Sequence, residues 1–304
     1  MKDSLGRPSG SLLYIALAVL ISAFTAAVLL LPYDTVYIQE ETYLLWFLVV
    51  MSVCFAVFLL GMTANALLWM RGKGLAGTPE ARLLLLVSRA VRTVFSRRLP
   101  GLLRTFLKEA MYTSKLRTLS RSRWLAHLLI LGGFAAMLVL DVVVTICLDV
   151  FHWSPMIDSD GWAKLLMRDL AFDIAGLMML VGLCMAIVRR LVLRPRQLAT
   201  ELADVASLSF LLIIVVGGFV LEGMGIDGAI PGHESENAYS FVGLAFSYVT
   251  PDSAGQYYDE AWLLHGVLSA LFVAYIPFSK LFHMIAAPIT ITLEGLATRE
   301  AGRR

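Results

Sequence analysis

Charged residues are scarce in this chain of 304 residues. They make up 16% of the sequence, whereas hydrophobic residues make up 59%, and the mean hydropathy is +0.77. Soluble globular proteins are about 45–50% apolar and about 25% charged. One buried core cannot hold this excess of apolar side chains, so the composition excludes an ordinary soluble domain. A lipid bilayer must solvate part of the surface.

Cysteine is also scarce, and its placement excludes several kinds of site. The three cysteines, Cys54, Cys147 and Cys184, each lie in an apolar run. Their spacing matches no zinc or iron–sulfur pattern, so we interpret them as small core residues. The sequence contains no C-x-x-C-H motif, and any haem would therefore be bound non-covalently. An iron–sulfur centre would have to lie on a partner, and we expect no nucleic-acid partner.

What is present is a series of long apolar runs. Windows of about 19–20 residues identify six candidate membrane spans. They are Leu12–Leu31, Tyr43–Met70, Trp124–Val150, Ala163–Val188, Ala203–Leu221 and Ala261–Thr290. Segments of this length satisfy their backbone inside a bilayer only as helices, which predicts an all-α transmembrane bundle. The first run is longer than the apolar part of a signal peptide, so we expect it to be retained.

The charges between the runs alternate in sign. Residues 71–123 carry 13 Lys/Arg and two Glu, residues 189–196 carry four Arg, and the chain ends in Arg303 and Arg304. The intervening loops are acidic, and their only basic residues are Lys164 and Arg168. The positive-inside rule therefore predicts that both termini are cytoplasmic, in a multi-pass protein of the cytoplasmic (inner) membrane.

This pattern divides the chain into four parts. Residues 1–70 form two transmembrane helices, residues 71–123 a cytoplasmic basic amphipathic segment, residues 124–290 a four-helix membrane core, and residues 291–304 a cytoplasmic tail. In residues 71–123 apolar and basic side chains alternate with near-helical spacing, which predicts one or two helices lying on the inner surface. That segment either binds anionic lipid or docks a cytoplasmic subunit, and the two roles are compatible.

Three of the five histidines, His127, His265 and His283, lie in apolar spans, where ionisable residues are expensive and usually functional. The 18 residues from 265 to 283 make five helical turns and rise about 27 Å, so we expect both imidazoles to share one face. Pro277 and Pro288 lie in the same span, and we expect its end to kink or to turn along the interface. His127 lies near the cytoplasmic start of its span, at the depth expected for His283. Paired imidazoles are typical of haem ligation, so we predict that His127 and His283 bind one haem b.

The neighbouring residues allow two interpretations. Gly132 and Gly133 would let a flat macrocycle approach the helix, or they would pack two helices tightly. Any one buried histidine could instead be an interhelical hydrogen-bonding group. Arg123 and Lys280 are candidates to bind haem propionates.

The outer haem site is less complete. His265 is the candidate ligand, and its partner is His152, Met137 or an open position. His233 lies in a Gly/Pro/Glu-rich loop, where we expect it to be exposed and to bind nothing.

Two stretches, SRSRWLAHLLILGGF and WLLHGVLSALFVAYIPFSKLFHMIAAP, resemble membrane cytochrome b subunits of the nitrate reductase gamma type. They are more specifically similar to the membrane subunit of heterodisulfide reductase and the M subunit of the dissimilatory sulfite reductase-associated complex. The resemblance covers roughly residues 120–290. It implies a subunit of an anaerobic respiratory complex with one or two b haems, ligated by His127, His283 and His265. Where that type has a second early histidine, this chain has Met137.

The resemblance also implies partners. Electrons would pass between menaquinol and a cytoplasmic iron–sulfur subunit of the heterodisulfide reductase D type. Further periplasmic and membrane redox subunits could complete the complex. The family's quinol site has a lysine at the start of the helix after the early-histidine span, and Lys164 matches that description.

Four charged residues, Lys164, Arg168, Asp169 and Asp173, crowd the start of the fourth span. They either pair as structural salt bridges or serve a quinone site. In the second case Lys164 donates to a quinone oxygen, and an aspartate such as Asp169, or His152, takes the proton. Asp141 is a second candidate proton carrier.

Two other functions compete with electron transfer. A transporter or channel would show paired mid-membrane charges and an inverted repeat, whereas these charges cluster near one face and no repeat is visible. A non-redox membrane anchor would use its histidines only as hydrogen-bonding groups.

Overall fold

The computed structural model describes residues 10–30, 41–71, 77–96, 99–158, 160–193, 201–228, 238–283 and 285–290. Across these residues the secondary structure is helical, without a strand. Six helices are long and apolar enough to cross a bilayer: Ser11–Leu30, Glu41–Trp69, Arg121–Val150, Lys164–Leu193, Leu202–Asp227 and Ser253–Phe278. The prediction of an all-α, six-span protein is therefore confirmed. His233 and the tail 291–304 lie outside the described residues.

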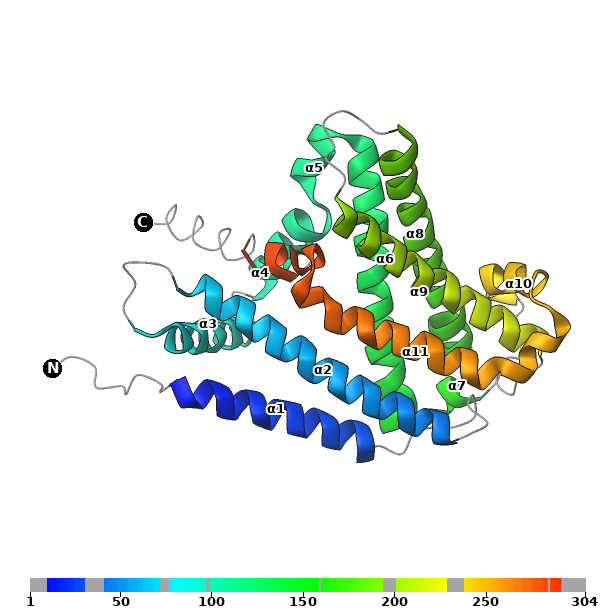
Figure 1. Ribbon diagram of the computed structural model, residues 1–304, viewed down its shortest axis with the longest axis horizontal. Coiled ribbons are helices and arrows are strands. Elements are labelled where there is room, and N and C mark those ends of the chain that lie inside the picture. The colour runs from blue at the N-terminus through cyan, green and yellow to red at the C-terminus, as the bar shows by residue number, and fades with distance from the viewer. Residues whose placement is uncertain are drawn as a thin grey trace. The chain divides into compact units, whose positions relative to one another are not determined.

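Figure 1 shows the elements in chain order. The α-helices are α1 (Gly10–Leu30), α2 (Glu41–Trp69), α3 (Pro79–Val94), α4 (Leu99–Thr105), α5 (Ser114–Leu119), α6 (Arg121–Thr145), α7 (Ser154–Ile157), α8 (Ala171–Ile187), α9 (Leu202–Asp227), α10 (Phe241–Ser247) and α11 (Tyr258–Tyr275). Four π-helices, η1 (Phe106–Met111), η2 (Ile146–Val150), η3 (Lys164–Leu170) and η4 (Val188–Leu193), adjoin longer helices. The 3₁₀ segments are η6 (Asp252–Tyr257), η7 (Ile276–Phe278) and η8 (Lys280–Phe282).

The chain forms two compact units. One comprises residues 1–29, 51–110 and 273–304, and the other comprises residues 30–50 and 111–272. Large apolar side chains on the spans are widely exposed, for example Val19 (61%), Val139 (61%) and Ile213 (57%). Exposed apolar side chains along helices of bilayer length are what a lipid-facing surface requires. The protein is a multi-pass membrane protein.

In the first unit, α2 packs on the segment that follows α11. A Cβ added to Gly61 would lie 2.7 Å from Pro277 Cβ and 2.8 Å from Phe278 Cζ, so the glycine permits this close approach. The Asn65 amide donates to the Pro277 carbonyl at 2.7 Å. Backbone groups freed inside a bilayer need such a partner. Asn65 thus stabilises an interrupted helix.

The interruption lies at Pro277, one of the two prolines expected to kink the end of the span Ala261–Thr290. Helix α11 ends at Tyr275, and Ser279 is extended, with φ −118° and ψ 171°. Pro277 lacks an amide hydrogen and cannot continue the helical ladder. The Ser279 hydroxyl accepts from the Leu281 amide and starts a new turn that leads to His283.

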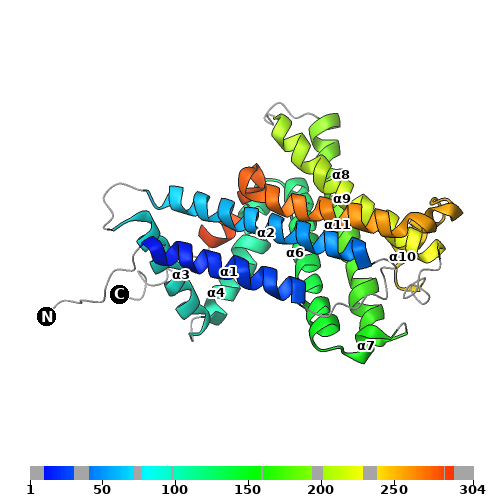
Figure 2. The ribbon, with the colours of Figure 1, turned by 60° about the horizontal axis from the view of Figure 1, so that its bottom comes forward.

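In the second unit, α6 and α8 run side by side (Figures 1 and 2). Two glycines bring their backbones together. A Cβ on Gly133 would lie 2.6 Å from the Ala175 carbonyl oxygen, and one on Gly182 would lie 3.0 Å from the Ala126 carbonyl oxygen. Small residues at helix crossings allow this close packing in membranes.

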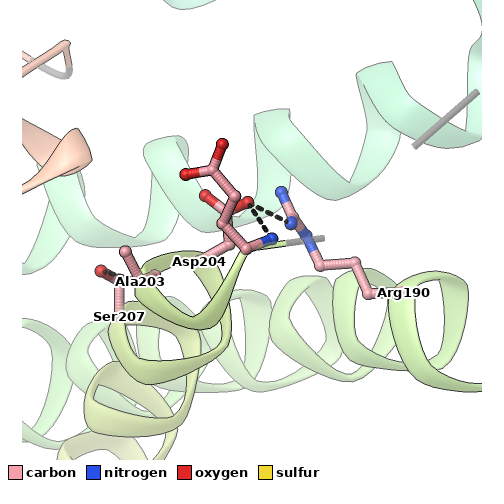
Figure 3. A network of polar contacts seen from close by, with 5 residues as sticks. Arg190, Ala203, Asp204 and Ser207 are labelled. Carbon is pink, nitrogen blue, oxygen red and sulfur yellow. Dashed lines mark hydrogen bonds and ion pairs between the residues drawn. The ribbon is translucent and has the colours of Figure 1, made fainter. Parts of the chain in front are cut away.

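A polar network joins the end of the α8 helix to the start of α9 (Figure 3). Arg190 of η4 donates to Asp204 Oδ2 at 2.9 Å. The same oxygen accepts from the Glu201 amide at 3.3 Å, within a capping box. One carboxylate therefore caps α9 and pairs with η4.

Candidate functional site

The two histidines predicted to bind the inner haem lie in different units. His127 is half-buried in the second turn of α6. His283 is exposed, and its Nδ1 contacts the Lys280 carbonyl oxygen, to which an Nδ1–H donates. That hydrogen bond leaves Nε2 with its lone pair, which is the tautomer a metal-ligating histidine adopts. The facing arrangement of His127 and His283 stays a prediction.

The expectation that His265 and His283 share one helical face requires an unbroken helix. Because α11 ends at Tyr275 and Ser279 is extended, counting turns of 3.6 residues no longer relates the two imidazoles. The periodicity argument for a shared face therefore does not apply, and the relative orientation of the two imidazoles stays a prediction. Whether His265 or His283 ligates a haem iron does not depend on a shared face, and this ligation stays a prediction.

His265 lies against a second glycine doublet, which sequence reasoning missed. A Cβ on Gly217 of α9 would lie 3.4 Å from His265 Nδ1, and one on Gly218 would lie 3.4 Å from Cε1. The half-buried imidazole therefore packs closely on the α9 backbone, with no space for a macrocycle between them. A haem ligated by His265 would have to approach from another side of the ring. The VVGGFV run in an apolar span was the available sequence signal.

The possible partners of His265 have different environments. His152 is exposed and adopts a left-handed conformation, with φ 44°. Met137 packs on α8, where its Cε would lie 3.3 Å from a Cβ on Gly176. Gly133 likewise contacts α8, which supports tight packing rather than an open face for a macrocycle.

Lys164 and Asp169 form a buried ion pair. Lys164 Nζ donates to Asp169 Oδ2 at 3.0 Å, and the side chains are 0% and 2% exposed. In an α-helix, residues five apart point about 140° from each other. Residues 164–170 form a π-helix instead, in which i and i+5 meet in successive turns. Of the four charges at the start of this span, the structure thus joins Lys164 and Asp169 in a salt bridge.

Asp173 has a different partner from the one expected. Its carboxylate is 1% exposed and accepts from the amides of Val242 at 3.0 Å and Gly243 at 3.4 Å. These amides open α10, so Asp173 holds the first turn of that helix. Glu222 of α9 lies at the same turn, since a Cβ on Gly243 would lie 2.5 Å from Glu222 Oε2.

Asp149 is a buried acidic residue that sequence reasoning missed. It is 7% exposed at the end of η2. Its neighbour Leu148 packs with Met156 and Ala163 in a small core next to η3. An aspartate at the end of an apolar run was the only signal for it. Asp141 of α6 is exposed.

The propionate candidates differ in burial. The Nε of Arg123 is buried and has no hydrogen-bond partner among the residues that the structure describes. Lys280 is exposed beside His283. A buried donor left without an acceptor costs about 1–3 kcal/mol, so an anionic group at Arg123 would be favourable. Within the described ranges no three His, Cys, Asp or Glu side chains are grouped to hold a metal ion, but a haem needs only one or two axial ligands. The buried Nε of Arg123 is the feature described here that would suit a haem propionate.

The sequence matches one protein family over most of this region. The model of HdrE, a subunit of dihydromethanophenazine:CoB–CoM heterodisulfide reductase, matches residues 103–291. The HdrE protein from Methanosarcina mazei is 28% identical over 181 residues, 58% of this chain and 61% of the relative. Its counterpart from Methanosarcina barkeri is 25% identical over 195 residues, 63% of this chain and 66% of the relative. The match to the Methanosarcina acetivorans protein, at 24% identity over 258 residues, covers 80% of this chain and 89% of the relative.

This chain thus matches just under two thirds of the length of the M. mazei and M. barkeri relatives. No solved structure matches it.

Proposed function

Because this chain belongs to the HdrE family of heterodisulfide reductase membrane subunits, we propose that it is the haem b-carrying membrane subunit of an electron-transfer complex. It exchanges electrons between a reduced carrier dissolved in the membrane and a cytoplasmic iron–sulfur subunit of the heterodisulfide reductase D type. The observation that carries this proposal is the contact of His283 Nδ1 with the Lys280 carbonyl oxygen, because an Nδ1–H donated there favours Nε2 as the iron ligand.

The proposed electron carrier belongs to a chemical class that includes more than menaquinone. The relatives' name gives dihydromethanophenazine as the reduced carrier, and it does not support menaquinone. Quinols and dihydrophenazines are both flat, apolar, two-electron and two-proton donors. The proposal is therefore a reduced carrier of this chemical class, and menaquinol is one member to be tested.

His127 and His283 would hold the inner haem, and His265 would hold a second haem if one is present. Arg123 Nε would face a propionate, with Lys280 at the other candidate position. Bound haem would supply single-electron transfer through the bilayer. The protein residues fix the iron ligands and balance the propionate charge.

Lys164 and Asp169 are the proposed carrier and proton site. A carrier that accepts a hydrogen bond from Lys164 Nζ would take the place of Asp169, since the two side chains are now joined at 3.0 Å. The displaced Asp169 Oδ2 would then accept one carrier proton. Oxidation of one carrier releases two electrons and two protons, and the second proton would leave by the exposed His152 to water.

The test is the haem content and spin state of the purified full chain, expressed with haem supply. We expect one or two haems per chain by pyridine haemochrome, and a low-spin spectrum that a quinol or dihydrophenazine analogue reduces. His283→Ala should lose a low-spin signal while the protein stays folded. His233→Ala, a histidine outside the predicted haem-binding set, is the matched control. A wild-type chain that binds no haem, or a His283→Ala variant with an unchanged spectrum, would refute the proposal.

A further inference from the structure

Helices α3 and α4 with η1 carry paired apolar and basic stripes that the proposed electron transfer does not use. On α3, Val87 and Val91 are 50% and 51% exposed, one helical turn apart, and Phe95 beyond the helix is 87% exposed. On α4 and η1, Leu103 and Leu107 are 47% and 58% exposed. Each stripe repeats at i and i+4, so it forms a continuous apolar edge on one side of its helix.

Basic side chains flank both apolar edges. Arg92 follows Val91, and Arg104 and Lys108 follow Leu103 and Leu107, so the cations lie about 100° around the helix from the apolar stripe. Arg92, Arg104 and Lys108 are all exposed. We call these three cations and the five apolar residues of the preceding paragraph the interfacial surface.

The start of α3 is attached to the end of a membrane span. Arg82 Nη1 donates to the carbonyl of Met70, the residue that follows α2. Trp69, the last residue of α2, is 50% exposed and packs on Phe282 with ring centroids 5.0 Å apart. Aromatic residues of this kind concentrate at the membrane–water boundary. The first turn of α3 therefore lies at that boundary and not far out in the aqueous phase.

We propose that the interfacial surface binds the anionic phospholipid headgroup layer beside the end of α2. Its apolar edges enter the boundary of the acyl chains, and Arg92, Arg104 and Lys108 reach lipid phosphates. Charge complementarity favours this occupant, because residues 71–123 carry 13 Lys/Arg and two Glu. The anchored start of α3 holds the interfacial surface at the membrane–water boundary. Lipid is always present at that depth, whereas a soluble partner is not.

The experiment uses the full chain in vesicles, with Cys54, Cys147 and Cys184 replaced by Ala and a single Val91→Cys carrying a polarity-sensitive fluorophore. Vesicles contain phosphatidylcholine alone or with phosphatidylglycerol, each with a shallow spin-labelled lipid as quencher. We expect strong quenching at Val91 that increases with phosphatidylglycerol. The matched control is Leu85→Cys, an exposed position about 120° around the same helix from Val91, where quenching should be weaker.

A second experiment removes the three positive charges of the interfacial surface. In Arg92→Gln/Arg104→Gln/Lys108→Gln, each lost cation should weaken docking about fivefold, and the dependence on phosphatidylglycerol should disappear. Equal quenching at Val91 and Leu85, or no quenching at Val91 in either lipid, would overturn the proposal.

Discussion

At the scale of single residues, the buried ion pair between Lys164 and Asp169 is the most consequential feature. Enclosing two charges is expensive, and the pair is tolerated because each charge compensates the other. The sequence showed charges entering a span but not which of them pair. The π-helical backbone decides the pairing, and no residue type specifies a π-helix reliably.

Removing one charge of this pair should be far more damaging than removing both. Asp169→Leu is expected to cost about 3–5 kcal/mol, because it leaves an enclosed ammonium without this carboxylate. Lys164→Met combined with Asp169→Leu should recover most of that loss and stay folded, yet fail to oxidise the carrier. Thermal unfolding in detergent measures the stability. A single variant as stable as the double variant would show that the two charges do not act as a unit.

The Asp173 carboxylate should matter to α10 more than to α8, on which it lies. Asp173→Ala removes the acceptor of the Val242 and Gly243 amides, at a cost of about 1–3 kcal/mol. We expect faster hydrogen exchange of residues 241–247, with little change in α8. Asp173→Asn keeps a carbonyl oxygen and should lose less protection. Unchanged exchange in the alanine variant would rule out this capping role.

At the scale of helices, the contact between α6 and α8 depends on one glycine of a doublet. An added Cβ would lie 2.6 Å from a backbone oxygen at Gly133, but 3.4 Å from the mobile end of Met178 at Gly132. Gly133→Ala should therefore lower the unfolding temperature clearly, by the cost of overpacking, about 1–3 kcal/mol. Gly132→Ala is the matched control and should be nearly neutral. Equal effects of the two changes would contradict the packing described for α6 and α8.

The existence of the six spans could be predicted, because length and apolar content alone define a bilayer span. The kink at the end of Ala261–Thr290 could be predicted as well, because Pro277 lies within that span. Its form could not be predicted: α11 ends at Tyr275 and Ser279 is extended. The break depends on a distant residue, because Asn65 supplies the donor for the freed Pro277 carbonyl. Local sequence does not contain that information.

The residues of the candidate site could be predicted better than their arrangement in space. The spans revealed His127, His265 and His283 by the rarity of ionisable residues in membranes. His265 packs closely on Gly217 and Gly218 because α11 packs on α9. This contact joins segments that are far apart in the chain, so local sequence patterns do not predict it. Family membership confirms a membrane subunit of heterodisulfide reductase type. The resemblance to nitrate reductase gamma subunits stays a prediction.

At the scale of the whole molecule, the alternation of loop charge predicts that both ends of the chain face the cytoplasm. A green fluorescent protein fused to either end should fluoresce, whereas alkaline phosphatase fused there should be inactive. Fusion of the phosphatase within residues 229–237, an acidic stretch between α9 and α10 in the sequence, should give an active enzyme and serves as the control. Opposite activities at the two ends would require an odd number of crossings and would contradict the six-span topology.

The widened turns of η3 have a consequence for how this protein can be altered. A deletion of one residue within 165–168 could be absorbed by tightening the backbone to a regular α-helix. Lys164 and the aspartate would then be four positions apart, about 40° around the helix, and would still face each other. Such a variant is expected to keep both its ion pair and its hydropathy profile. An insertion of one residue in the same stretch would instead turn Lys164 away from the aspartate, so the widened turns leave room for a shorter segment but not for a longer one.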